Sequence, residues 1–303
     1  MKKNAALVLV GLIIGASILI ASTMKPSEEE SAYATYNEAL SGPTYYSVKV
    51  PNYIDFAGER VPTEIDDVKE RLERELLVTA YRHSNTFLML KRKARWFPVI
   101  EQILREEGVP DDFKYLCVAE SALANAVSPA GAKGFWQFLS RTGKEYGLEV
   151  NDVVDERYHV EKSTRAACKY LKQSKARFGS WTAAAASYNM GSAGLNRQME
   201  RQKERDYYDL LLNDETSRYV FRILAFKEVL NHPANYGFII DYNDQYQPYV
   251  YSEVIVDSNV DSFADFAQQF NTNYKTLKKL NPWLRDSYLK VPAGKTYTVK
   301  IPL

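Results

Sequence analysis

The 303-residue chain is poor in the residues on which many protein functions depend. It has only 2 cysteines and 3 histidines, and neither type shows the spacing of a metal site, so we assign no metal and no cofactor. Cys117 and Cys168 stand beside apolar neighbours in predicted helices, so buried free thiols are expected and a single bridge is the alternative. The chain also lacks a phosphate-binding glycine loop and a Gly-x-Ser-x-Gly turn, the motifs of nucleotide-binding proteins and of many serine hydrolases.

An excess of charge of one sign is also missing. The 39 basic and 38 acidic residues leave a net charge of +1, so we expect no polyanion-binding field and no nucleic-acid partner. Hydrophobic residues make up 46% of the chain, an ordinary globular proportion. The length is sufficient for one large core and smaller modules.

One long apolar run is present, close to the N-terminus. Lys2 and Lys3 precede an uncharged, mostly apolar stretch over residues 5–22, which is typical of an export or anchoring signal. Its length leaves two alternatives open, a cleaved signal peptide and a retained membrane anchor with the rest of the chain outside the cytoplasm. No cysteine follows the run, so a lipoprotein anchor is not expected, and residues 26–43 indicate a flexible tether.

Apolar residues at helical spacing predict a mainly α protein up to about residue 238. The pattern fills residues 66–88 and continues over 92–107, which form a helical preface. Residues 125–134, with Ser128-Pro129 and two glycines, must form a loop. The further helices are expected over residues 110–124, 140–146, 160–178, 181–188 and 215–231.

Glu120 has an unusual place for a carboxylate. Leu116 and Leu123 stand four residues before it and three after it, which puts Glu120 on the apolar face of its helix. An ionised carboxylate is costly to bury, so such a group tends to raise its pKa and stay protonated, as a general acid must. The alternative is a glutamate at the edge of the apolar stripe that pairs with an arginine.

Other features bear on the same site. Glu145, Asp152 and Asp155 lie in or near polar turns and are expected to be solvated, so Glu120 is the one good acid candidate. The 125–134 loop leads directly into Phe135-Trp136-Gln137, and its glycines would let the backbone approach a ligand closely. The aromatic pair can line a saccharide groove, although Trp136 as a core filler is the alternative.

The character of the sequence changes after residue 238. Residues 241–248 are a polar, tyrosine-rich linker. Residues 251–256 alternate like a strand, 262–270 and 273–280 predict two short helices, and 296–301 alternate like a closing strand. The C-terminus is therefore expected to form a small βααβ unit.

Four motifs fall in an order and spacing that resembles the lysozyme-like lytic transglycosylases of bacterial peptidoglycan, most closely the membrane-bound lytic murein transglycosylase D type. The resemblance covers about residues 53–238. Two departures from the common family wording are mild, namely Phe135-Trp136 inside the second motif and Ser187 before Tyr-Asn. The motifs are Glu120-Ser121, Gly134-Phe135-Trp136-Gln137, Ser187-Tyr188-Asn189 with Gly191, and Glu215-Thr216 with Tyr219-Val220.

The C-terminal unit resembles a LysM-like module, which binds N-acetylglucosamine chains. It lacks the usual Gly-Asp-Thr-Leu start of the first helix, so a cap that only packs on the enzyme is the alternative. The two resemblances together imply a lysozyme-like helical catalytic domain with an N-terminal helical extension and this module. The implied divisions are 1–24 signal peptide or anchor, 25–50 linker, 51–107 helical extension, 108–239 catalytic domain, 240–248 linker and 249–303 LysM-like module.

The family resemblance also implies the chemistry and the partners. The substrate would be a peptidoglycan glycan strand, cleaved between N-acetylmuramic acid and N-acetylglucosamine with formation of a 1,6-anhydro end. Glu120 would be the acid and the base. Two other functions stay open, a lysozyme-type hydrolase on the same fold and a catalytically silent wall-binding protein. The residues implied to contact or surround the substrate are Ser121, Gly134, Phe135, Trp136, Gln137, Tyr188, Asn189, Glu215 and Tyr219.

Overall fold

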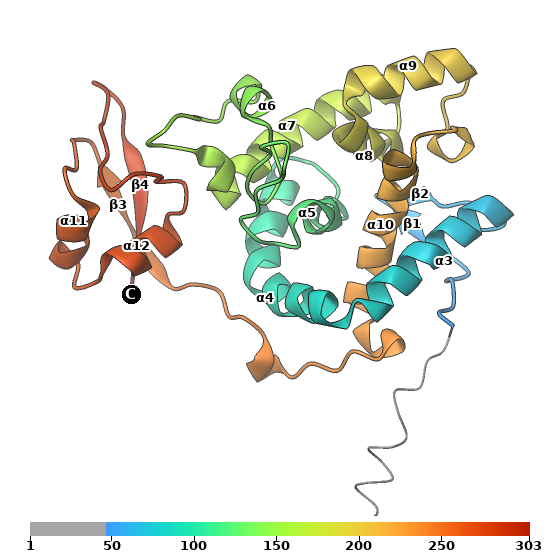
Figure 1. Ribbon diagram of the computed structural model, residues 1–303, viewed down its shortest axis with the longest axis horizontal. Coiled ribbons are helices and arrows are strands. Elements are labelled where there is room, and N and C mark those ends of the chain that lie inside the picture. Colours follow the sequence, from blue (N-terminus) through green and yellow to red (C-terminus); the bar gives the residue numbers. More distant parts are fainter. Residues whose placement is uncertain (1–46) are drawn as a thin grey trace, which may run out of the picture. The chain divides into compact units, whose positions relative to one another are not determined.

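The computed structural model describes residues 47–303 (Figure 1). The apolar run over residues 5–22 and the tether over 26–43 lie outside these described residues. Val48–Leu303 form one compact unit. Within the described part of the chain, no helix is both long and apolar enough to cross a membrane.

The larger part of this unit is helical, as expected. A short hairpin of β1 (Asp55–Phe56) and β2 (Glu59–Arg60) precedes the helices, with Phe56 paired to Glu59. Figure 1 shows α5 in the middle of the surrounding helices. The helices are α3 (Asp66–Tyr81), α4 (His83–Glu106), α5 (Phe113–Ser121), α6 (Ser140–Glu145), α7 (Val160–Phe178), α8 (Trp181–Met190), α9 (Ser192–Gln202) and α10 (Asp214–Asn231).

The first two helices divide at a different point from the predicted one. The expected helix over 66–88 ends at Tyr81, because Arg82 leaves the helical conformation with a ψ of 55°. The hydroxyl of Thr86 donates to the carbonyl of Thr79 across the break at 2.6 Å. Apolar residues continue at helical spacing on both sides of Arg82, so periodicity alone could not reveal this break.

The helix that carries Glu120 is shorter than predicted at both ends. The expected range was 110–124, whereas α5 spans Phe113–Ser121. Ala122 and Leu123 take left-handed conformations with φ of 50° and 57°, which end the helix. Arg92 Nη1 donates to the Ala122 carbonyl at 2.9 Å and so holds this turn. Glu120 therefore lies in the last turn of α5, beside a chain reversal.

The helical core surrounds α5. Phe113, Leu116 and Cys117 are fully buried in one hydrophobic cluster, together with Val220 and Leu224 of α10. Helix α5 packs against α4 and α10, and α7 packs against α4 and α8. Helix α9 was not anticipated, because its sequence is mostly polar and buries few apolar side chains.

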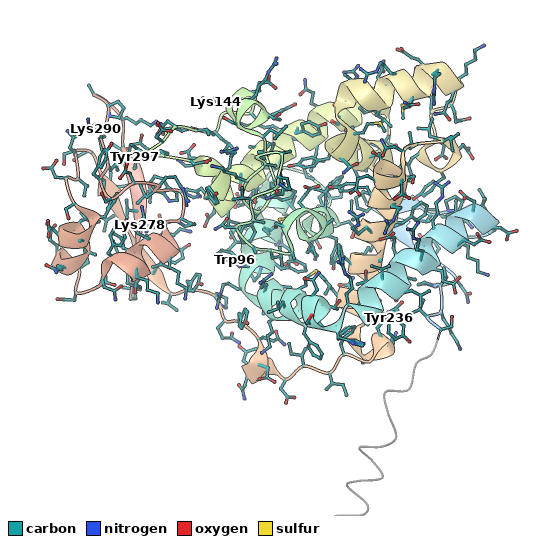
Figure 2. The ribbon with its side chains drawn as sticks, viewed as in Figure 1. Trp96, Lys144, Tyr236, Lys278, Lys290 and Tyr297 are labelled. Carbon is teal, nitrogen blue, oxygen red and sulfur yellow. The ribbon has the colours of Figure 1, made fainter. Side chains whose placement is uncertain are left out.

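The C-terminal residues form the expected βααβ unit. Strand β3 (Tyr251–Val256) pairs antiparallel with β4 (Tyr297–Pro302), and α11 (Phe263–Gln269) and α12 (Tyr274–Leu280) lie between them in the chain. Trp283 stacks on Tyr297, which is labelled in Figure 2, with ring centroids 5.7 Å apart.

This C-terminal unit shares a core with the helical part. Val154 and Tyr158 belong to the same buried cluster as Trp283 and Leu284. The backbone N–H of Asp155 donates to the Trp283 carbonyl at 2.9 Å. Ion pairs between Lys295 and Glu149 and between Lys300 and Glu161 join the same two segments. The unit is therefore packed against the helical part through residues 149–161.

Candidate active site

Glu120 projects from the last turn of α5 toward α10. The phenol of Tyr219 on α10 donates a hydrogen bond to Glu120 Oε1. Burial raises the pKa of Glu120 to about 7, while the Tyr219 hydrogen bond and the Arg222 charge act in the opposite direction. Glu120 is half-buried as a residue, and Tyr219 is the direct partner of its carboxyl group.

Two hollows meet at Glu120. The first, which we name the neutral hollow, has a volume of about 520 Å³. Apart from Glu120, no charged residue of the described chain lines it. Its lining includes Ser128, Gln137, Phe138, Thr142, Tyr170, Tyr188 and Asn189.

The second hollow, which we name the arginine hollow, has a volume of about 630 Å³ and is lined by three arginines. Arg82 comes from the break between α3 and α4, and Arg218 and Arg222 come from α10. The second acid in its lining is Glu75, whose buried carboxylate accepts from Arg218 Nε at 2.7 Å. Glu120 thus separates a neutral region from a cationic one.

Gln137 is held in the neutral hollow by an unusual backbone conformation. It has a φ of 49°, and its side-chain Nε2 donates to the carbonyls of Ala126 at 3.1 Å and Gly134 at 2.7 Å. Both bonds use the amide nitrogen, so Gln137 Oε1 is left as an acceptor toward a ligand. The sequence expectation that Gln137 lies near Glu120 agrees with this position, since both residues line this hollow.

Tyr188 and Asn189, at the end of α8, line the same hollow. The Tyr188 phenol donates to the Trp136 carbonyl at 2.8 Å, and burial raises the pKa of Tyr188 well above its ordinary value, so it stays protonated. Asn189 Oδ1 accepts from the Thr216 hydroxyl at 2.8 Å. Both side chains are therefore oriented by contacts that leave the Asn189 amide N–H groups for a ligand.

The expectation that Phe135 and Trp136 line a saccharide groove beside Glu120 was wrong. Phe135 is 1% exposed and Trp136 is fully buried, and Trp136 Nε1 donates to the Thr164 hydroxyl at 2.8 Å. Phe135 packs on Trp96 of α4, labelled in Figure 2, with ring centroids 4.9 Å apart. The two rings fill the core because the left-handed turn at Gln137 directs only the glutamine into the hollow.

Gly134 also serves the protein rather than a ligand. It has a φ of 81°, and a Cβ atom built there would lie 1.8 Å from the Arg157 carbonyl oxygen. The close backbone approach expected at this glycine is thus an approach to residue 157.

Of the remaining predicted residues, Ser121 lies in the arginine hollow and Glu215 lies on the surface. Ser121 lines the arginine hollow and donates to the Cys117 carbonyl at 3.2 Å, so it lies across Glu120 from Gln137. Glu215 is exposed, accepts from Arg222 Nη1 at 3.0 Å and lines neither hollow. Glu215 therefore lies outside both hollows, but it is near enough for its charge to help raise the pKa of Glu120.

Asp155 was expected to be solvated, and that expectation was wrong. Its side chain is 4% exposed, and both carboxylate oxygens accept from Arg157, at 2.8 Å from Nε and 2.7 Å from Nη2. Arg157 Nη1 also donates to the carbonyls of Gly131 and Phe138, each at 3.2 Å. This pair holds the loop that carries Gln137, and no sequence motif announced it.

The cysteines and the acids show no further chemistry. Cys117 and Cys168 are buried and unpaired, and burial raises the pKa of both thiols. Within residues 47–303, no group of three or more His, Cys, Asp or Glu side chains is arranged to hold a metal ion.

Comparisons with known proteins agree with this architecture. Residues 97–211 match the family model of the transglycosylase SLT domain, and residues 252–303 match that of the soluble lytic transglycosylase C-terminal LysM-like domain. The membrane-bound lytic murein transglycosylase D of two Escherichia coli strains is 28% identical over 232 residues, which cover 75% of this chain and 50% of the relative. The chain thus spans about half the length of these curated relatives.

A solved structure is also similar, that of an inactive mutant of lytic transglycosylase Slt from Pseudomonas aeruginosa. It is 19% identical, with a TM-score of 0.36 over 50% of this chain and 26% of that chain. The chain therefore contains a transglycosylase SLT domain followed by a C-terminal LysM-like domain, and it is a distant homologue of membrane-bound lytic murein transglycosylase D.

Proposed function

We propose that the protein is a peptidoglycan lytic transglycosylase that cleaves the bond between N-acetylmuramic acid and N-acetylglucosamine and leaves 1,6-anhydro ends. One observation carries the proposal. The carboxyl group of Glu120 has no cation in hydrogen-bond contact, has a pKa raised to about 7, and stands where two hollows meet. A strand that occupies both hollows would pass its backbone over a carboxylic acid that is still protonated near neutral pH.

The surroundings of Glu120 favour chemistry with a single acid. Most glycosidases use two carboxylates on either side of the scissile bond. Among the described residues that line the two hollows, the second acid is Glu75, and its carboxylate is engaged by Arg218. The other groups needed for the reaction would then come from the substrate itself.

The proposed reaction has two steps. In the first, Glu120 gives its proton to the glycosidic oxygen, the bond from that oxygen to C1 of the muramic acid breaks, and the acetamido oxygen of the same sugar stabilises the developing positive charge. In the second, the Glu120 carboxylate takes the proton of the 6-hydroxyl, whose oxygen then bonds to C1. Glu120 ends in its starting protonation state, and no water is consumed.

Neighbouring side chains would position the acid and the sugar. The Tyr219 hydroxyl would hold Glu120 in place and stabilise the carboxylate between the two steps, because it donates to that group. Gln137 Oε1 and the Asn189 amide would bind sugar substituents in the neutral hollow, and Tyr188 would provide part of its wall. Ser121 would contact the strand on the other side of Glu120.

The test combines a substitution with a product analysis. Glu120→Gln keeps size and polarity but cannot donate a carboxylic proton, so binding should survive while turnover falls by roughly two to four orders of magnitude. Products of the unsubstituted enzyme on purified peptidoglycan should be lighter by one water than hydrolytic products and should resist borohydride reduction. Undiminished turnover of the glutamine variant would refute the role of Glu120.

The same product analysis separates the two other functions. Reducible ends as the main product would identify a lysozyme-type hydrolase that positions a water on this fold. Absence of any soluble product, together with sedimentation on insoluble peptidoglycan, would identify a silent wall-binding protein. The raised pKa of Glu120 favours an enzyme over the silent binder, since a binding protein gains nothing from a carboxyl group that stays protonated near neutral pH.

We also propose that the protein acts outside the cytoplasm, in the cell envelope, and that both of its domains contact glycan strands. The support is the apolar run over residues 5–22 and the similarity to a membrane-bound relative. Protease added to intact spheroplasts should then degrade the domain that carries Glu120. The domain limits stay part of this proposal, with 108–239 as the catalytic domain, and limited proteolysis should cut first within 240–248.

A further inference from the structure

The two hollows at Glu120 differ in charge, and the difference indicates which part of a substrate each would accept. The neutral hollow offers hydroxyl groups, amides and aromatic rings, which suit uncharged sugar rings. The arginine hollow offers guanidinium groups from Arg82, Arg218 and Arg222. Planar guanidinium groups bind carboxylates through paired hydrogen bonds, so this hollow suits an acidic ligand.

Two of the three arginines are already engaged by the protein. Arg218 donates to Glu75 and, at 3.5 Å, to Asp214, and Arg222 donates to Glu215. Their guanidinium groups have five N–H donors each, so donors remain for a ligand, but much of their charge is compensated.

Arg82 differs from both of them. It is exposed at the mouth of the hollow, and within residues 47–303 its side chain forms no ion pair and no hydrogen bond. Its backbone sits at the break between α3 and α4, where the helical pattern is interrupted by a ψ of 55°. The next lining residue is Asn85, also exposed, which adds an amide to the same mouth.

We infer that the arginine hollow binds a carboxylate carried by a substituent of the muramic acid, with Arg82 as the specificity-determining residue. The inference rests on the proposed function. In a strand that occupies both hollows, an acidic substituent would be matched in the arginine hollow, because the neutral hollow has no cation among its described lining residues. The acidic substituents are the lactyl group of muramic acid and the peptide that is attached to it in the cell wall.

The test is a binding measurement that does not depend on turnover. The full chain would be titrated with three soluble glycan fragments that share one sugar backbone. The first has a peptide with free carboxylates, the second has the same peptide with its carboxylates converted to amides, and the third has no peptide and so exposes the lactyl carboxylate. Cleavage of each fragment would be measured separately, so a failure of the proposed reaction is recognised independently.

We expect the chain to bind the first fragment about three- to tenfold more tightly than the second, a modest ratio because Arg82 is solvent-exposed. Arg82→Gln should remove this preference, and Arg82→Lys should restore part of it. Arg74→Gln is the matched control, because Arg74 is an exposed arginine of α3 that pairs with Asp214 and lines neither hollow.

The three fragments also identify the source of the carboxylate. If the third fragment binds tightly and this binding depends on Arg82, the carboxylate is that of the lactyl group. If the third fragment binds weakly, the carboxylate is that of the peptide. Equal affinity of the unsubstituted chain for all three fragments would overturn the inference. A preference that survives Arg82→Gln would overturn the role of Arg82.

Discussion

Asp155 and Glu120 are two acids of the helical part whose surroundings are opposite. Asp155 accepts two hydrogen bonds from Arg157, and Lys133 lies 3.7 Å from the same carboxylate. Glu120 accepts from the neutral hydroxyl of Tyr219 and has no cation within ion-pair distance. Asp155 is buried and Glu120 is half-buried, and the larger difference between them lies in the partner of each carboxyl group.

The comparison separates a structural acid from a reactive one. The negative charge of Asp155 is matched by Arg157, which also donates to the carbonyls of Gly131 and Phe138. This acid therefore helps to fix the backbone of the loop between those two residues. At Glu120 the charge is not matched by a neighbour in contact, which favours the proton on the carboxyl group. The pair of Asp155 and Arg157 holds the loop of Gln137 in place. The reaction at Glu120 would depend on the position that this loop gives to Gln137.

The largest effect on stability is expected when Asp155 loses its cationic partner, Arg157. Arg157→Leu leaves a buried, unpaired carboxylate and frees two loop carbonyls, so the free energy of unfolding should fall by about 3 to 5 kcal/mol. Arg141→Leu is the control, because the Arg141 side chain is 91% exposed in its pair with Glu145, and a change within about 0.5 kcal/mol is expected. Urea unfolding measures both, and equal losses would show that the Asp155 pair has no special role.

A second change tests the same region through its backbone. Gly134→Ala adds a methyl group where the Arg157 carbonyl oxygen would lie 1.8 Å away, in addition to the strain of a positive φ. We expect a loss of about 2 to 4 kcal/mol, together with weaker sugar binding because the Gln137 loop must shift. Gly131→Ala is the matched control, since its φ is 79° and no atom lies within 4 Å of the added methyl. It should cost only about 1 to 2 kcal/mol.

Periodicity and end signals in the sequence predicted much of the helical fold. Helix α7 begins and ends at the predicted residues, 160 and 178, because the apolar stripe is regular and Gly179 takes the left-handed conformation after it. The apolar position of Glu120 followed from the same periodicity. The break at Arg82 did not, because it depends on tertiary contacts such as the Thr86 hydrogen bond to Thr79.

The site was less predictable than the fold because its contacts join distant segments. Tyr219 stands 99 residues after Glu120 in the chain, and nothing local to either residue indicates their hydrogen bond. The sequence left the burial of Trp136 open for a similar reason, since its partner Thr164 is on another helix. The order of the motifs predicted which segments surround Glu120. The orientation of each side chain depends on packing between distant segments.

A third test replaces Glu120 and Asp155 by their amides and compares the sign of the change in the free energy of unfolding. The raised pKa of Glu120 means that, between about pH 4.5 and 7, the folded state binds more protons than the unfolded state. The free energy of unfolding therefore falls as pH rises through that range, by no more than about 3 kcal/mol in total. Glu120→Gln removes this penalty and should stabilise the protein at pH 8 but not at pH 4.

Asp155→Asn should have the opposite sign at pH 8, because it leaves Arg157 buried without its counter-charge. Thermal unfolding of the two amide variants at pH 4 and pH 8 measures both effects. Destabilisation by both substitutions at pH 8 would mean that Glu120 is also stabilised as an ion, which would remove the contrast between the two regions.

The smallest effect concerns the hydrogen bond between Tyr219 and Glu120. Activity that needs the protonated acid should fall as pH passes about 7. The Tyr219 hydrogen bond lowers the pKa of Glu120, so Tyr219→Phe should move this fall upward, by about one pH unit. Tyr207→Phe is the control, because Tyr207 is a buried tyrosine near the same helix that donates to the carbonyls of Thr216 and Ser217. The pH profile of kcat for the two variants tests whether Tyr219 sets the pKa of Glu120. A limb that stays in place in Tyr219→Phe, or moves equally in both variants, would show that Tyr219 supports packing and does not set the proton affinity of Glu120.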